Sequence, residues 1–186
     1  MDDVSVGFKG GKLGYLGPAA QAPSAEVVID GQGMVALPGL VDPHTHAVWA
    51  GSRADEFEQR LAGAKYADIL EAGGGILSTV AATRQADEAT LAQLAQARLS
   101  GMVDRGVTTV EIKSGYGLNP ETEARMLRAA RACGDTCRVI TTYLGAHTVP
   151  AEHRAHRAAY VAQVIGPGLE ACAPLADHID VYCDRG

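Results

Sequence analysis

Aromatic side chains are scarce in this chain: they make up 5% of its 186 residues, with a single tryptophan and two phenylalanines. Long apolar runs are also missing, because no uninterrupted stretch reaches the about 18 residues that a membrane-spanning helix needs. The start, Met1-Asp2-Asp3, is acidic and lacks the apolar segment of a secretory signal. Basic residues number 16 against 22 acidic ones, and the net charge of −6 argues against a nucleic-acid surface. What remains is the composition of an ordinary soluble globular protein.

Cysteine is present, but without the spacing of a redox or zinc motif. The four cysteines lie at positions 133, 137, 172 and 183, and none forms a C-x-x-C pair. A disulfide framework is typical of shorter, loop-rich secreted chains. We therefore expect reduced structural thiols and a cytoplasmic location, with a redox or metal role for the cysteines as the alternative.

Glycine and proline punctuate the first 35 residues every few positions. Three short apolar runs lie between them, at 4–8, 12–16 and 26–30. This pattern predicts short antiparallel strands joined by turns.

From residue 34 onward, near-continuous apolar runs alternate with stretches of helical period. The runs cover 35–41, 107–112, 138–144 and 178–182. The middle two are rich in β-branched residues, as expected for strands buried on both faces of a parallel sheet.

Helices are expected between these runs. An apolar stripe at helical spacing runs from Leu91 to Met102, and Gly106 supplies a stop. Asn119 followed by Pro120 predicts the start of a second helix, over 120–131. Strand and helix alternating over short connections predict right-handed βαβ units. Four such strands fit half of a (β/α)₈ barrel, which in full takes about 250 residues, and they fit a small doubly wound sheet equally well.

A pair of histidines, His44 and His46, closes the first apolar run. In a strand, residues i and i+2 point to the same face and lie about 6.5 Å apart. Two imidazoles placed in this way can both reach one divalent ion, through bonds of about 2.1 Å. The carboxyl ends of barrel strands are also where catalytic groups gather. The alternative is two unrelated surface histidines, because H-x-H arises often by chance.

The residues around this pair carry a resemblance to a known superfamily. The segment LPGLVDPHTHAVWAG, residues 37–51, contains the P-G-x-[VI]-D-x-H-x-H pattern of the amidohydrolases. Further blocks resemble the imidazolonepropionase family within it, in that family's order: RADEFE at 53–58, GGGILSTV at 73–80, GVTTVEIKSGYGL at 106–118 and LGAHTVP at 144–150. The similarity extends from about residue 27 to the end of the chain.

The resemblance implies a fold and a domain division. Residues 1–36 would be the N-terminal strands of a small β-sandwich domain. Residues 37–186 would be the first four β/α units of an incomplete (β/α)₈ TIM-type barrel in an α/β protein. We therefore expect the chain to be an N-terminal fragment, with the remaining metal ligands and the main catalytic acid or base beyond Gly186.

The resemblance also implies roles for individual residues. His44 and His46 would be ligands of one divalent metal ion, zinc or iron, since imidazole suits both. Arg53, Tyr116 and His147 would contact the substrate. A guanidinium suits a propionate carboxylate, and the glycines beside Tyr116 would let backbone and phenol approach a ligand closely. Without the resemblance, Arg53 would be a solvated charge, Tyr116 an ordinary loop residue and His147 a structural one.

The activity that the resemblance implies is hydrolysis of 4-imidazolone-5-propanoate to N-formimidoyl-L-glutamate in histidine degradation. The expected partners are this small-molecule substrate and a second copy in a homodimer, with neither nucleic acid nor a membrane. Two alternatives stay open: another cyclic amidohydrolase of the dihydroorotase, hydantoinase or guanine deaminase type, and a non-catalytic half-barrel. Glu111 and Lys113 alternate with apolar neighbours, so we expect them to face the barrel interior in a structural or supporting role.

Overall fold

The computed structural model describes residues 3–65, 68–69 and 73–183. They form two compact units, Met1–Pro38 and Gly39–Gly186. All four cysteines are free.

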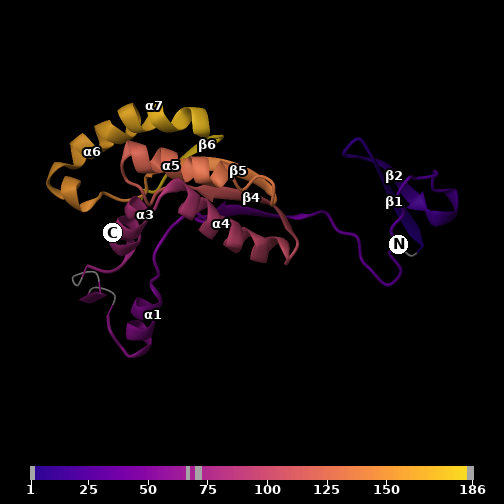
Figure 1. Ribbon diagram of the computed structural model, residues 1–186, viewed down its shortest axis with the longest axis horizontal. Helices are drawn as coiled ribbons and strands as arrows, with labels where there is room; N and C mark the ends of the chain where they lie inside the picture. The colour runs from indigo at the N-terminus through magenta and orange to yellow at the C-terminus, as the bar shows by residue number, and fades with distance from the viewer. Residues whose placement is uncertain (1–2, 66–67, 70–72, 184–186) are drawn as a thin grey trace. The chain divides into compact units, whose positions relative to one another are not determined.

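The first unit is built on one antiparallel strand pair, β1 (Val4–Lys9) and β2 (Lys12–Pro18), followed by the short helix η1 (Ala19–Gln21) (Figure 1). Gly10 and Gly11 join the strands with φ of 58° and 72°, the left-handed backbone that a two-residue hairpin turn requires. These two strands confirm the expected antiparallel pattern. The prediction of a third strand at 26–30 was wrong. The segment is not part of a sheet, and the side chains of Val27, Val28 and Ile29 are exposed.

The second unit contains a four-stranded parallel sheet. Its strands are β3 (Leu40–Thr45), β4 (Val107–Lys113), β5 (Arg138–Ala146) and β6 (His178–Val181). They pair in the order β3-β4-β5-β6, which is also their order along the chain. A doubly wound sheet reverses its strand order at a switch point, so that alternative was wrong.

The first strand of this sheet starts later than the apolar pattern predicts. The expected strand covered 35–41, whereas β3 begins at Leu40 and ends at Thr45. Pro38 and Gly39 interrupt the run, and proline cannot donate to a strand ladder. A Cβ on Gly39 would lie 2.1 Å from Thr108 Oγ1, so the backbone of β3 approaches β4 closely at this glycine. The shift places His44 inside the strand and His46 directly after it.

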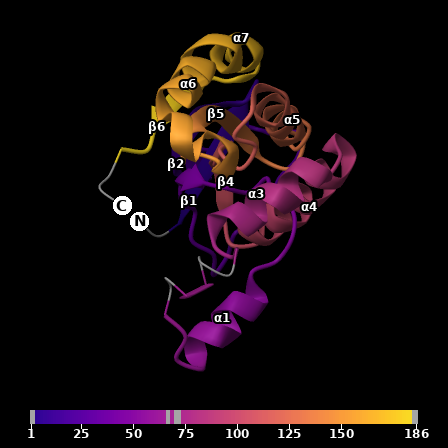
Figure 2. The same ribbon diagram turned by 90° about the vertical axis from the view of Figure 1, so that its left-hand side faces the viewer.

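Helices follow the strands as expected. They are α1 (Ala54–Leu61), α3 (Ile76–Gln85), α4 (Glu88–Val103), α5 (Pro120–Arg131), η2 (Ala151–His156), α6 (Arg157–Gln163), η3 (Val164–Gly168), α7 (Leu169–Cys172) and η4 (Ala173–Leu175). In α5, the Asn119 side chain accepts a hydrogen bond from the Thr122 amide, and Pro120 is the first helical residue. The predicted N-cap is therefore confirmed. Figure 2 shows α4, α5 and α7 in succession along one side of the sheet.

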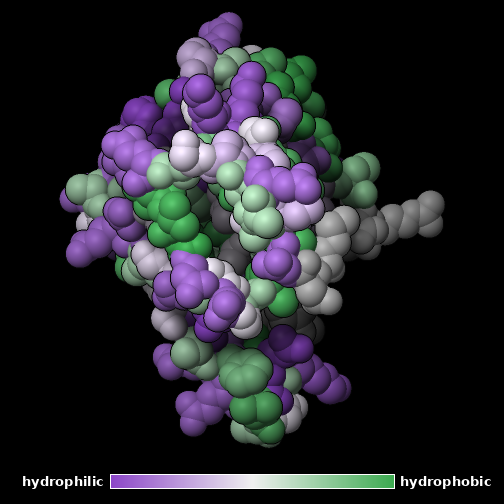
Figure 3. All heavy atoms as spheres, turned by 90° about the vertical axis from the view of Figure 1, so that its right-hand side faces the viewer, coloured by the Kyte–Doolittle hydropathy of each residue, from purple (hydrophilic) through white to green (hydrophobic). Residues whose placement is uncertain are grey.

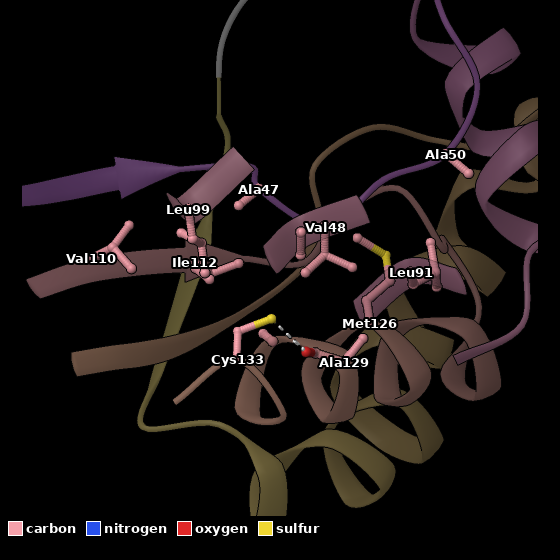
Figure 4. Packing of buried hydrophobic residues seen from close by; sticks show 12 residues of the cluster. Ala47, Val48, Ala50, Leu91, Leu99, Val110, Ile112, Met126, Ala129 and Cys133 are labelled. Atoms are coloured by element: carbon pink, nitrogen blue, oxygen red, sulfur yellow. Dashed lines mark hydrogen bonds between the residues drawn. The ribbon is translucent and has the colours of Figure 1, made fainter. Parts of the chain in front are cut away.

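The core of the second unit lies between the sheet and these helices (Figure 4). Val110 and Ile112 of β4 point toward α4 and α5, where Leu91 and Leu99 are completely buried. The predicted apolar stripe of α4 is thus its core face. Apolar side chains also remain on the surface, and hydrophobic patches interrupt the polar ones in Figure 3.

Leu99 is the natural test of this core, because its side chain is wholly buried between α4 and the sheet. Leu99→Ala should lower the free energy of unfolding by about 3 kcal/mol, from lost burial and the cavity that remains. Urea unfolding followed by circular dichroism measures the change. Gln93→Ala, on the exposed side of the same helix, should stay within about 0.5 kcal/mol of the parent. Equal effects of the two substitutions would contradict this packing.

Candidate functional site

The predicted histidine pair lies at the carboxyl end of β3. The ring centroids of His44 and His46 are 5.9 Å apart, and the rings are steeply inclined at 66°. Burial first, and then the charges of His147, His44 and Lys113, lower the pKa of His46 to about 4, although a hydrogen bond with the Ser114 backbone acts in the opposite direction. The ring is therefore neutral near pH 7, which is the form that binds metal ions.

Two more of the predicted site residues lie against this pair. His147, directly after β5, stacks on His46 with ring centroids 4.8 Å apart and an angle of 9°. Tyr116, in the loop after β4, lies 5.0 Å from His46 and 5.4 Å from His147. Because three parallel strands end at the same edge of the sheet, their following residues meet there. The structure thus brings together His44, His46, Tyr116 and His147.

Arg53 belongs to a different element from these four residues. It precedes α1 and forms an ion pair of 2.8 Å with Glu56. Glu56 also accepts hydrogen bonds from the Gly75 amide and the Ser78 hydroxyl, which ties α1 to the start of α3. Burial raises the pKa of Tyr116, and the positive charge of Arg53 lowers it. The charge of Arg53 therefore acts on Tyr116.

The hydrogen bond of His147 places a proton on one ring nitrogen. Its Nδ1 lies 2.8 Å from the backbone oxygen of Gly115. A carbonyl oxygen only accepts hydrogen bonds, so Nδ1 carries the proton and Nε2 of the neutral ring has the lone pair. Gly115 has φ of 110°, and a Cβ there would lie 2.8 Å from Nδ1 of His147. The glycine predicted to permit a close approach does so, but toward His147.

A buried ion-pair group lies on the same face of the sheet. Lys113 Nζ is 2.7 Å from Glu111 and 2.9 Å from Asp180 of β6, and its side chain is 6% exposed. Burial opposes the charged form, but the bonds to both carboxylates raise the pKa of Lys113 overall. Glu111 also accepts a hydrogen bond from the Thr142 hydroxyl. The alternation of Glu111 and Lys113 with apolar residues predicted a shared face for them, whereas Asp180 was missed, although it follows His178 at strand spacing.

Arg98 of α4 holds the chain that follows the histidine pair. Its Nη1 donates to the backbone oxygens of Ala47 and Trp49, at 2.7 and 2.8 Å. Its guanidinium also lies 3.7 Å from the centre of the Trp49 ring. Sequence analysis gave Arg98 no role, because a long-range bond to backbone leaves no local pattern.

Possible metal ligands are few around the pair in the part of the chain that the structure describes. No group of three or more His, Cys, Asp or Glu residues there is arranged to hold a metal ion. His46 Nδ1 is buried and has no hydrogen-bond partner among the described residues. Buried nitrogens are normally paired, so an unpaired one beside a second imidazole fits a metal ligand. Among the same residues, no helix is long and apolar enough to cross a membrane.

Comparison with known proteins gives a consistent group of relatives. The chain is similar to proteins named imidazolonepropionase: it is 50% identical to that of Shewanella frigidimarina over 193 aligned residues, 51% to that of Caulobacter vibrioides over 190, and 48% to that of Shewanella putrefaciens over 193. These alignments cover 99–100% of this chain and 47% of each relative. The chain therefore spans about half the length of the curated relatives it matches. No family model matches the chain.

The Arg98 contacts can be tested through Trp49, the only tryptophan in the chain. Arg98→Ala should shift the fluorescence of Trp49 to the red and lower the free energy of unfolding by about 2 kcal/mol, because two charge-assisted hydrogen bonds and the ring contact are lost. Arg105→Ala removes the same charge from an exposed position just after the end of α4, and should leave the emission unchanged. If both variants kept the parent spectrum, Arg98 would not hold this segment.

Proposed function

This chain belongs to the imidazolonepropionase family, and on that premise we propose that it forms part of a metal-dependent hydrolase that opens the ring of 4-imidazolone-5-propanoate to give N-formimidoyl-L-glutamate. One observation carries the proposal: His44, His46, Tyr116 and His147, from three strand ends, form a single group. Each lies in a block that resembles the family. We further propose that the four strands are half of a (β/α)₈ barrel, which their uniform order supports.

We assign one divalent ion, zinc or iron, to His44 and His46. The neutral ring and the unpaired Nδ1 of His46 support this assignment. When bound, such an ion lowers the pKa of a water molecule and polarises a carbonyl oxygen. Since such sites use three or more protein ligands, the others and the main acid or base belong to the half of the relatives that this chain does not span.

The chain's own residues would bind and orient the substrate. Arg53 would bind the propionate carboxylate, and Glu56 fixes the guanidinium through Nε. Because burial raises the pKa of Tyr116, its phenol stays protonated near pH 7 and can donate a hydrogen bond to the ring. Together they would hold the carbonyl carbon in place for attack by water.

His147 has a more specific part. Its Nδ1–H is committed to Gly115, so Nε2 of the neutral ring accepts a proton or a hydrogen bond. This arrangement favours acceptance of a proton from the substrate ring or from water over donation to the carbonyl. We place the protein in the cytoplasm and expect a homodimer, by analogy with the family.

Metal content and turnover, with Zn²⁺ or Fe²⁺ supplied, test the proposal in a protein that joins this chain to the half of its relatives that it does not span. We expect hydrolysis of imidazolone propionate in preference to dihydroorotate, hydantoin and guanine. His44→Ala and His46→Ala should each lower metal affinity by more than about 100-fold. This is a larger loss than the one expected for a residue that only hydrogen-bonds a metal ligand. His156→Ala, at an exposed position, should change neither quantity.

Each other outcome points elsewhere. Preference for another of the cyclic substrates would indicate a neighbouring amidohydrolase. Stoichiometric metal that survives His46→Ala would remove the pair from the site. A folded protein of this joined kind with neither metal nor turnover would support the non-catalytic alternative.

A further inference from the structure

We propose that Glu123 is a positioning residue, whose buried carboxylate shapes the loop Ser114–Leu118 and thereby fixes the tautomer of His147 and the place of Tyr116. The inference deepens the proposed function and rests on it for the roles of these two residues. Glu123 lies in the first turn of α5 and is only 1% exposed. Sequence analysis assigned it no part.

The carboxylate of Glu123 binds this loop at three backbone amides. Its Oε1 accepts hydrogen bonds from the amides of Gly117 and Leu118, at 2.8 and 2.7 Å. Its Oε2 accepts one from the amide of Gly115, at 2.8 Å. The hydroxyl of Ser114 also bonds this carboxylate, and the same hydroxyl oxygen accepts from the Leu144 amide of β5. One side chain therefore organises the whole connection from β4 to α5.

Three backbone donors favour the carboxylate form of Glu123. Burial raises the pKa of Glu123, and the donors from Ser114, Leu118, Gly115 and Gly117 offset only part of that rise. Because both oxygens already accept from backbone amides, a proton on either oxygen would compete with these bonds. The start of a helix also favours a negative charge. The substitution Glu123→Gln would keep one acceptor oxygen, but its NH₂ group would face the donors at the other position.

The backbone of the loop explains why it needs such a brace. A Cβ on Gly117 would lie 2.6 Å from the amide nitrogen of Glu123, so the loop presses directly on the helix. Leu118 has φ of 54°, which is unfavourable for a residue with a side chain. Unfavourable backbone of this kind persists only where surrounding contacts enforce it. The bond from the Leu118 amide to Glu123 is such a contact.

The effect reaches the site through Gly115. Its amide donates to Glu123, and its carbonyl accepts Nδ1–H of His147. A change at Glu123 therefore moves the acceptor that selects the tautomer of His147. Tyr116 follows directly in the loop, 5.4 Å from the same ring.

The test is the ¹⁵N NMR spectrum of His147 in the neutral ring, in the parent chain and in Glu123→Gln. The parent should show the Nδ1–H tautomer, with Nε2 unprotonated. Glu123→Gln should shift the tautomer ratio toward Nε2–H by about tenfold, the effect of one buried hydrogen bond. Glu121→Gln is the matched control: it removes the same charge from the same helical turn, at a side chain that is 85% exposed. It should leave the ratio unchanged.

Kinetics then separate this inference from the proposed function. In a preparation that turns over imidazolone propionate, Glu123→Gln should lower kcat by about 10- to 100-fold, with a smaller change in KM, because Arg53 is not part of the loop. Glu121→Gln should stay within about twofold. A preparation without turnover would count against the function, while the tautomer measurement would still decide the inference. An unchanged tautomer in folded Glu123→Gln, or an altered tautomer with parental kcat, would overturn it.

A variant that fails to fold leaves a measurement on the parent chain. Hydrogen exchange of the Gly115, Gly117 and Leu118 amides should be slowed by at least about 100-fold relative to an unstructured peptide of the same sequence, since each is bonded and buried. Exchange of these amides at the peptide rate would overturn the proposal.

Discussion

Parallel pairing in chain order is the constraint from which the site follows. In such a sheet every strand delivers its carboxyl end to the same edge. β3, β4 and β5 pair in this way, so the residues after each of them meet although they are far apart in sequence. The outer face of β4 secures the arrangement, because Val110 and Ile112 pack against α4 and α5. Helices and strands thus supply rigid supports, and short loops carry the polar groups.

Sequence could predict the elements whose evidence is local. The stripe of α4, the Asn119-Pro120 start of α5 and the β-branched runs of β4 and β5 each depend on neighbouring residues, and the structure confirms them. The strand expected at 35–41 was misplaced, because apolar composition does not reveal where Pro38-Gly39 stops pairing. The run at 26–30 is as apolar as a strand, but pairing requires a partner that composition does not specify.

The candidate site likewise contains residues that the sequence predicted and residues that it did not. His44, His46, Tyr116 and His147 were found through motifs, and strand ends explain why they meet. Their roles as ligands and substrate contacts stay predictions. The roles of Arg98 and Glu123 could not be predicted from the sequence, because these side chains bind backbone groups. A bond to a backbone group constrains only the residue that supplies the side chain.

The buried Lys113 adds a requirement that reaches the edge strand β6. Its ammonium joins Glu111 on β4 to Asp180 on β6, two strands that are separated by β5. β6 has four residues, so its backbone hydrogen bonds alone give it little hold on a register. A slip of one residue would bring Ile179 or Val181 to the lysine and leave a buried charge half unpaired, which is costly. The ion pair therefore selects the register of β6: this strand pairs in the alignment that neutralises Lys113.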